Sequence, residues 1–196
     1  MRRSLFGLMA LLALASLAFM TGCERIQTLR VVTVNHGSLF DCDVRDHWLY
    51  VDPIEKDSSM EVAIFDDTVT VEMQYVEIGA GLPTWTPYQA ILTKGTIKYT
   101  SLREETEYED VVTPLTVSVP ADPEGKKTTK FKMCVVPAWW KELYFSEGDP
   151  DEIIDVVDAE ITFSAYDSIS MMTRTAKGNL QIEIADFYDD PEGAGR

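Results

Sequence analysis

Residues 68–78 read TVTVEMQYVEI, and this stretch decides the fold. Apolar and polar residues alternate along it, so one row of side chains can face a core while the other faces water. Gly79, Gly81 and Pro83 follow and end the pattern. The stretch therefore predicts a β-strand whose inward-facing residues are Val69, Val71, Met73 and Tyr75.

Similar segments recur on both sides of this strand. We expect further strands at 29–34, 60–65, 88–93, 96–101, 115–119, 128–136, 159–165 and 180–184, and a short one within 38–53. Residues 122–125 (DPEG) and 177–179 (KGN) are predicted turns, and residues 167–175 form a further candidate strand. The chain therefore predicts an all-β fold, an antiparallel β-sandwich of about 7–9 strands. Its body is expected at residues 29–188, followed by an acidic flexible tail at 189–196.

The composition is acidic and fits one domain. The chain has 196 residues, with 17 Lys and Arg against 33 Asp and Glu and a net charge of −16. This length suits a single domain of about 100–200 residues. A body with this charge repels phosphate backbones, so nucleic acid is not an expected partner.

The first 23 residues, MRRSLFGLMALLALASLAFMTGC, have the layout of an export signal. Arg2 and Arg3 precede an apolar run, which ends in small residues and Cys23. This ending resembles the lipobox of bacterial lipoproteins. The resemblance implies that residues 1–22 are a cleaved signal helix, that Cys23 carries acyl chains such as palmitate, and that residues 23–28 are a lipidated tether. The alternative is a plain membrane-spanning helix, but no basic stop-transfer cluster follows the apolar run.

The same resemblance implies a location. Glu24 follows the cysteine, where Asp would retain a lipoprotein of enteric bacteria at the inner membrane. We therefore expect the bacterial cell envelope, with the anchor in the outer membrane and the body facing either the periplasm or the outside. Loss of Arg2 and Arg3 with the signal reduces the 17 basic residues to 15 and makes the net charge −18.

A second resemblance concerns the end of the chain. Residues 158–190, DAEITFSAYDSISMMTRTAKGNLQIEIADFYDD, are similar to the closing hairpin of immunoglobulin-like domains in small bacterial lipoproteins of unassigned function. The resemblance implies an immunoglobulin-like arrangement of the sandwich and says nothing about an activity.

Two cysteines remain besides Cys23. Cys42 and Cys134 form an even pair in a chain expected in an oxidising compartment, so a disulfide between them is a candidate. Such a bridge would contribute about 4–5 kcal/mol through loop closure. Alternation along residues 128–136 puts Cys134 on the lysine side, which would place the bridge on the outside of the sheet. Two unpaired thiols are the alternative.

Acidic residues gather near the predicted strand ends. The loops of a sandwich meet at its poles, where carboxylates could supply the roughly six to eight oxygens that Ca²⁺ prefers. The weak Ca²⁺ candidates are Asp66, Asp67, Asp149 and Asp151. Ordinary solubilising charge is the alternative, because no EF-hand spacing is present. No other metal site and no cofactor are expected.

Trp139 and Trp140 are a candidate aromatic binding patch, with Tyr144 and Phe145 close in sequence. Such rings could stack on a sugar or contact a partner protein. The alternative is that one Trp fills the core while its neighbour covers the edge of the sandwich.

Catalytic motifs are missing from the sequence. His36 and His47 stand in no recognisable triad, and no GxSxG, HExxH, P-loop or GxGxxG pattern occurs. We therefore expect a non-enzymatic binding or structural role, with the membrane reached through Cys23 and an envelope protein or glycan as partner. The alternatives are a Ca²⁺-assisted or carbohydrate-binding module and, ranked last, an envelope hydrolase.

Overall fold

The computed structural model describes residues 26–51, 58–78, 88–103, 106–145 and 153–186. These residues contain ten strands, one α-helix and one short 3-10 turn. The strands are β1 (Ile26–Val34), β2 (Phe40–Asp43), β3 (Asp46–Val51), β4 (Ser58–Ala63), β5 (Asp67–Ile78), β6 (Gln89–Ser101), β7 (Val111–Asp122), β8 (Thr129–Val136), β9 (Ile153–Asp167) and β10 (Thr173–Ala185). The turn η1 (Asn35–Gly37) joins β1 to β2, and the helix α2 (Ala138–Phe145) lies between β8 and β9.

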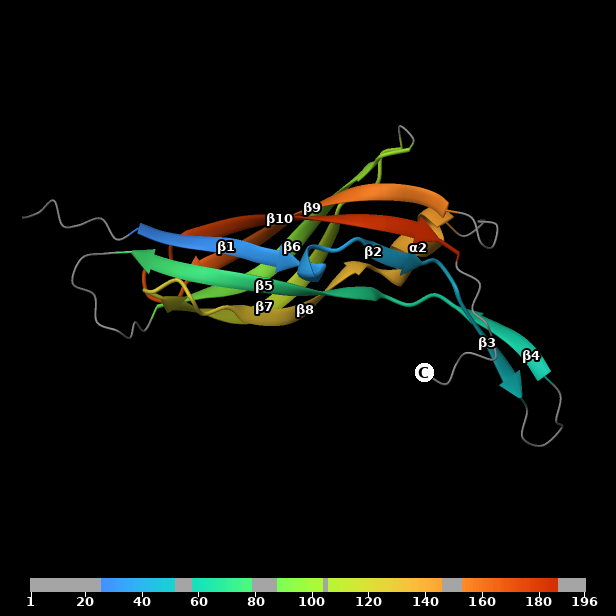
Figure 1. Ribbon diagram of the computed structural model, residues 1–196, viewed down its shortest axis with the longest axis horizontal. Coiled ribbons are helices and arrows are strands. Elements are labelled where there is room, and N and C mark those ends of the chain that lie inside the picture. Colours follow the sequence, from blue (N-terminus) through green and yellow to red (C-terminus); the bar gives the residue numbers. More distant parts are fainter. Residues whose placement is uncertain (1–25, 52–57, 79–87, 104–105, 146–152, 187–196) are drawn as a thin grey trace, which may run out of the picture.

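Eight of the strands form one curled sheet (Figure 1). Its order is β1-β5-β7-β6-β9-β10-β2, and β8 also pairs with β5. Most neighbours are antiparallel, but β5 with β7 and β10 with β2 are parallel. The prediction of an all-β fold is confirmed, whereas the sheet is mixed rather than wholly antiparallel. The strands β3 and β4 pair with each other in a separate hairpin that extends from one end of the body.

The alternation along β5 builds the core. The four residues expected to face inward are each exposed by 2% or less: Val69, Val71, Met73 and Tyr75. The outward row has one exception, because Gln74 is buried beside β1. Its Oε1 accepts a hydrogen bond of 2.7 Å from Arg30 Nε, which satisfies the buried amide oxygen.

The closing hairpin of β9 and β10 turns at a different place than expected. The two strands pair along their whole length, so the chain reverses at residues 168–172. The predicted turn at 177–179 and the candidate strand at 167–175 are therefore wrong. Gly178 lies inside β10 for a packing reason, since a Cβ there would come within 3.0 Å of the Val31 side chain. This glycine lets β1 cross close to β10.

Two strand boundaries also differ from expectation. The segments 88–93 and 96–101 are one strand, β6, with a register shift between Leu92 and Lys94 where two strands had been expected. A bulge adds a residue without ending the pairing. β1 begins at Ile26, so it includes the last three residues of the tether predicted at 23–28.

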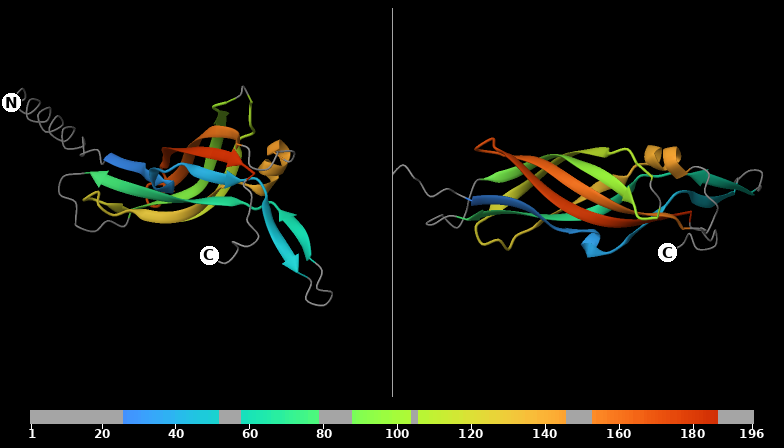
Figure 2. Two further views of the ribbon diagram at one scale, coloured as in Figure 1. Left: turned by 45° about the vertical axis from the view of Figure 1, so that its right-hand side comes forward. Right: turned by 90° about the horizontal axis from the view of Figure 1, so that it is seen from above.

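The body is elongated, and its two ends differ (Figure 2). The start of β1, the turn between β9 and β10 and the turn between β7 and β8 lie together at the β1 end. A hydrogen bond of 2.6 Å from Arg174 Nη2 to Gln27 Oε1 ties β10 to β1 there. The helix α2 and the β3–β4 hairpin lie at the opposite end, the α2 end. None of the described helices has the length and apolar character needed to cross a membrane.

Candidate functional site

Lys141 is buried in the body at the α2 end, with 1% of its surface exposed. Its Nζ lies 2.8 Å from Asp67 Oδ2 and donates a hydrogen bond to the backbone oxygen of Asp43. Lysine is almost never so buried unless its charge is paired. The ammonium therefore joins three elements that are far apart in sequence: α2, the start of β5 and the end of β2.

The neighbouring aspartate holds the beginning of the same helix. Asp66 Oδ1 accepts a hydrogen bond of 2.8 Å from the backbone N–H of Ala138, the first residue of α2. The first N–H groups of a helix have no partner inside the helix, so a carboxylate there supplies a missing acceptor. Asp66 and Asp67 thus connect the entry of β5 to both the backbone and a side chain of α2.

Both cysteine thiols lie within electrostatic reach of the pair of Asp67 and Lys141. Cys42 is fully buried, and burial together with the charge of Asp67 raises the pKa of its thiol far above the usual range. Burial, with the nearby aspartates, raises the pKa of Cys134 to about 11. Because the thiolate is the reactive form, both groups are poor nucleophiles at neutral pH. The observed contacts of this centre hold α2, β5 and β2 together.

The two residues are separate thiols in the structure. As expected, Cys134 lies in the same row of β8 as the exposed Lys130 and Lys132 and is half-buried, whereas Cys42 belongs to the core. Their shared neighbours, Asp67 and Lys141, put them in one region of the molecule. A disulfide between them stays a prediction.

A cluster of rings covers the core beside α2. Trp140 is fully buried, and four rings lie against it with centroid distances of 4.6–5.3 Å: those of Tyr99, Tyr108, Tyr144 and Phe145. Such tilted ring pairs stabilise a core beyond the apolar area that they bury. Two cavities adjoin the cluster: one, lined by Tyr108 and Tyr144 among others, holds about 160 Å³, and one, lined by Tyr99 and Tyr108 among others, holds about 400 Å³. Small-molecule sites usually exceed about 300 Å³, a size that the second cavity reaches and the first does not.

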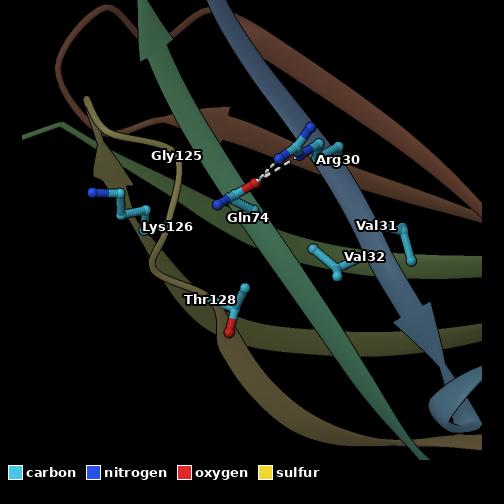
Figure 3. A pocket seen from close by; sticks show the side chains of 7 residues that line it. All are labelled: Arg30, Val31, Val32, Gln74, Gly125, Lys126 and Thr128. Atoms are coloured by element: carbon cyan, nitrogen blue, oxygen red, sulfur yellow. Dashed lines mark hydrogen bonds between the residues drawn. The ribbon is translucent and has the colours of Figure 1, made fainter.

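A larger groove lies on the outer face of β1 and β5 (Figure 3). Its volume is about 440 Å³, and it is open to solvent. Arg30 comes from β1, Gln74 from β5, and Lys126 from the turn between β7 and β8. The remaining lining residues are Val31, Val32, Gly125 and Thr128. Two cations, a hydroxyl and a small apolar floor could hold a compact anionic group such as a carboxylate or phosphate.

The turn that carries Lys126 is fixed by one carboxylate. Asp122 Oδ2 accepts hydrogen bonds of 2.6 Å and 2.7 Å from the backbone N–H groups of Lys126 and Lys127. These bonds from Lys127 and Lys126 outweigh the effect of burial and lower the pKa of Asp122 below its usual value. Gly125 has a φ of +63°, the left-handed conformation that glycine adopts without cost. The groove is therefore bordered by a turn of defined shape.

Comparison with known proteins identifies no relative. No protein-family model matches the chain, and no curated protein matches it with significance.

The aromatic patch predicted from the sequence does not form as a pair. Trp140 is 0% exposed and belongs to the core, so it is not available to a partner. Trp139 is 48% exposed on α2, and Leu143 on the same helix is 58% exposed. Of the predicted pair only Trp139 is exposed, and its apolar neighbour at the surface of α2 is Leu143, which was not predicted.

The two described calcium candidates, Asp66 and Asp67, both contact α2. Asp66 accepts a hydrogen bond from the Ala138 N–H, and Asp67 pairs with the ammonium group of Lys141, which lies where a bound cation would have to lie. Within the described ranges, no three His, Cys, Asp or Glu residues come together as a metal site. Asp149 and Asp151 lie outside the described residues.

The two histidines lie apart from these features. His36 is exposed in η1 with a φ of +54°, and His47 is a residue of β3. Cys23, the predicted lipidation site, lies outside the described residues.

Sequence reasoning missed Lys141 and Arg30. A signal for Lys141 was present, because Trp140 with Tyr144, and Lys141 with Phe145, are spaced by four residues as on one side of a helix. This spacing places Lys141 on the apolar side of a helix, where its ammonium group would need an acidic side chain as its partner. No comparable local signal marks Arg30, since its partners Gln74 and the turn at Lys126 are brought to it by strand pairing.

Proposed function

We propose that the chain is a lipoprotein of the bacterial cell envelope, held at the membrane through Cys23, whose folded body binds another envelope component without catalysing a reaction. The observation that carries the proposal is the lipobox-like ending of the apolar N-terminal run, followed almost at once by a folded strand. Glu24 favours the outer membrane as the place of the anchor.

The start of the fold suits a short tether. β1 begins at Ile26, three residues after Cys23. Three extended residues span at most about 10 Å, so an acylated Cys23 would keep the β1 end of the body close to the lipid headgroups. The α2 end would then face away from the membrane (Figure 1).

We further propose that the body is an immunoglobulin-like sandwich. In that fold one sheet contains strands A, B and E and the other contains C, F and G. The pairings of β1, β5 and β8 match the first set, and those of β6, β9 and β10 match the second. The chain also departs from the pattern, since Trp140, on α2, takes the place of a core Trp on strand C.

The binding surface that we propose lies at the α2 end. Trp139 and Leu143 are exposed on α2, and the β3–β4 hairpin extends from the same end. An exposed tryptophan on a firmly packed helix is typical of a contact surface for a protein, and Leu143 adds apolar area beside it.

Mass spectrometry of the protein purified from its native membrane tests the anchor. We expect a mature chain that begins at Cys23 and carries fatty acids. A chain that still begins at Met1, or a Cys23 without acyl groups, would contradict the proposal.

Site-specific crosslinking tests the binding surface. A photoreactive amino acid at Trp139 or Leu143 should join the protein to the same envelope component in intact cells. The matched control is Lys177, whose side chain is 63% exposed on β10. Equal products from Lys177 would argue against a specific surface on α2.

A further inference from the structure

We propose that the turn between β9 and β10 touches the membrane, with the side chains of Ile169, Met171 and Met172 entering the lipid headgroup region. We call these three residues the apolar tip. The inference rests on the proposed function, because it requires the anchor at Cys23, and it adds a second membrane contact on the folded body.

The three side chains of the apolar tip are exposed, although a hairpin turn does not require large apolar residues at these positions. Ile169 is 51% exposed, Met171 67% and Met172 59%. Hairpin turns usually carry small or polar residues, and three large apolar side chains within four positions form a local patch. Met171 also has a φ of +56°, a conformation in which glycine or asparagine would be less strained. Turn geometry therefore does not explain the choice of methionine.

The location of the turn indicates that the lipid bilayer is what contacts the apolar tip. β10 begins at Thr173, directly after the apolar tip, and Arg174 donates a hydrogen bond of 2.6 Å to Gln27. Gln27 follows Ile26, the first described residue after the predicted anchor. Figures 1 and 2 show the β9–β10 turn at the same end of the body as the start of β1. A lipid at Cys23 thus brings this turn, and not the α2 end, to the bilayer.

The backbone N–H groups of the turn already have acceptors within the protein. Asp167 Oδ1 accepts the N–H groups of Ile169 and Ser170 at 3.0 Å and 2.7 Å, and the Met171 N–H donates to the Asp167 backbone oxygen. The remaining N–H groups of residues 167–172 also have acceptors, in Met172, Gln89 and the Ser170 hydroxyl. Unpaired backbone groups make entry into lipid costly, so a turn without unpaired N–H groups can enter the interface readily.

The β7–β8 turn at the β1 end carries exposed charges of both signs, although the chain as a whole is acidic. Lys126 and Lys127 are exposed on the β7–β8 turn of the same end. Asp122 and Asp167 are buried and accept hydrogen bonds, whereas Glu124 of the β7–β8 turn is exposed and pairs with Lys126 at 3.0 Å. Lys127 leaves this turn with one exposed positive charge in excess, which can approach an anionic headgroup.

Hydroxyl-radical footprinting tests the apolar tip with native side chains. The acylated protein is reconstituted in nanodiscs of phosphatidylethanolamine and phosphatidylglycerol and compared with residues 24–196 in solution, which include every described residue. We expect oxidation of Met171 and Met172 to fall by about fivefold or more in nanodiscs, because the interface buries such side chains by about 5–10 Å. Trp139, at the α2 end and 48% exposed, serves as control and should be oxidised equally in both samples.

A charged variant gives a second measurement. Met171→Asp combined with Met172→Asp should abolish the protection of Ile169, while Leu143→Asp at the α2 end should leave it unchanged. Both methionines are exposed, so the double variant leaves the core intact.

The outcomes separate this inference from the proposed function. An unacylated Cys23 would overturn both. An acylated Cys23 with Met171 and Met172 as reactive in nanodiscs as in solution would overturn the apolar tip alone. Protection in intact cells but not in nanodiscs would also overturn it and would point to a protein that covers the turn.

Discussion

The ion pair of Lys141 and Asp67 links three elements through a single ammonium group. Lys141 is 1% exposed and Asp67 is 23% exposed, so the pair lies at the edge of the core rather than in its centre. Removal of one partner from a buried pair leaves an uncompensated charge, which costs far more than the pair itself contributes. The pair is therefore expected to matter most for the attachment of α2.

We predict that Lys141→Ala lowers the free energy of unfolding by about 3 kcal/mol, because Asp67 loses its counter-charge and a cavity opens. Chemical denaturation followed by circular dichroism measures this loss. The matched control is Lys177→Ala, since Lys177 pairs with Glu160 at 2.7 Å with both side chains largely exposed. That change should cost less than about 1 kcal/mol. Equal losses would show that burial does not distinguish the two pairs.

The thiols give a second test at the residue scale. The pKa of Cys134 is raised to about 11, so the neutral thiol predominates below that pH. We expect alkylation of Cys134 at pH 8 to be slower than that of a free thiol by about two orders of magnitude and to accelerate as the pH approaches 11. Cys42 should react only after unfolding, because it is fully buried. Labelling that appears only after a reductant is added would establish the disulfide instead.

At the scale of elements, the β9–β10 turn shows how one carboxylate shapes a hairpin. Asp167 is fully buried and accepts hydrogen bonds from the backbone of the turn and from the Tyr75 hydroxyl at 2.7 Å. Burial alone would raise the pKa of Asp167, but the hydrogen bonds from Ser170, Tyr75 and Ile169 lower it below its usual value. The same contact and burial raise the pKa of Tyr75 to about 12.

We predict that Asp167→Ala destabilises the protein by about 1–3 kcal/mol at pH 7, because buried N–H groups lose their acceptor. Since the folded-state pKa is lowered, the stabilisation is complete above the unfolded pKa of about 3.9 and is lost as the pH falls through the folded value. The difference between wild type and variant should therefore shrink at strongly acidic pH. Urea denaturation at pH 7 and below pH 4 measures it.

The control for this prediction is Asp158→Ala, which removes an exposed carboxylate from the same strand. We expect a change within about 0.5 kcal/mol at both pH values. A difference for Asp167→Ala that stays constant with pH would mean that its carboxylate is not the group that titrates.

At the scale of the whole molecule, the described residues form a curled sheet and a separate projecting hairpin. Eight strands share one sheet, whereas β3 and β4 pair only with each other among the described residues. Figure 1 shows this hairpin extending from the α2 end of the body. The backbone pairing of the described residues therefore separates the hairpin from the sheet.

We predict that replacement of residues 46–63 by a short Gly-Ser linker changes the melting temperature of the body by less than about 3 °C, because β3 and β4 form a separate two-stranded sheet and the pairing of the eight-stranded sheet is kept. Thermal unfolding followed by circular dichroism is the measurement. A large decrease would show that the hairpin stabilises the sheet. If the hairpin contributes to the proposed binding surface, the same variant should lose its crosslinks from Trp139 while remaining folded.

Much of the fold could be predicted because alternation is a local property. The inward rows of β5, β8 and β10 follow directly from side chains that point to opposite faces of a strand. The turn of the closing hairpin could not be predicted in this way, because Gly178 resembles a turn signal and yet serves the approach of β1. Little of the candidate site could be predicted, because Arg30, Gln74 and Lys126 come from three separate segments.

By itself, the sequence determined that the chain is all-β and acidic and begins with a run resembling a lipoprotein signal, since each is a property of composition or of neighbouring residues. Only the tertiary structure decided that Trp140 is core while Trp139 is surface, and that Asp67 faces Lys141. It also decided that the apolar tip lies beside the start of β1. These features depend on which distant strands pair, and pairing is selected by the packing of the whole core rather than by any one segment.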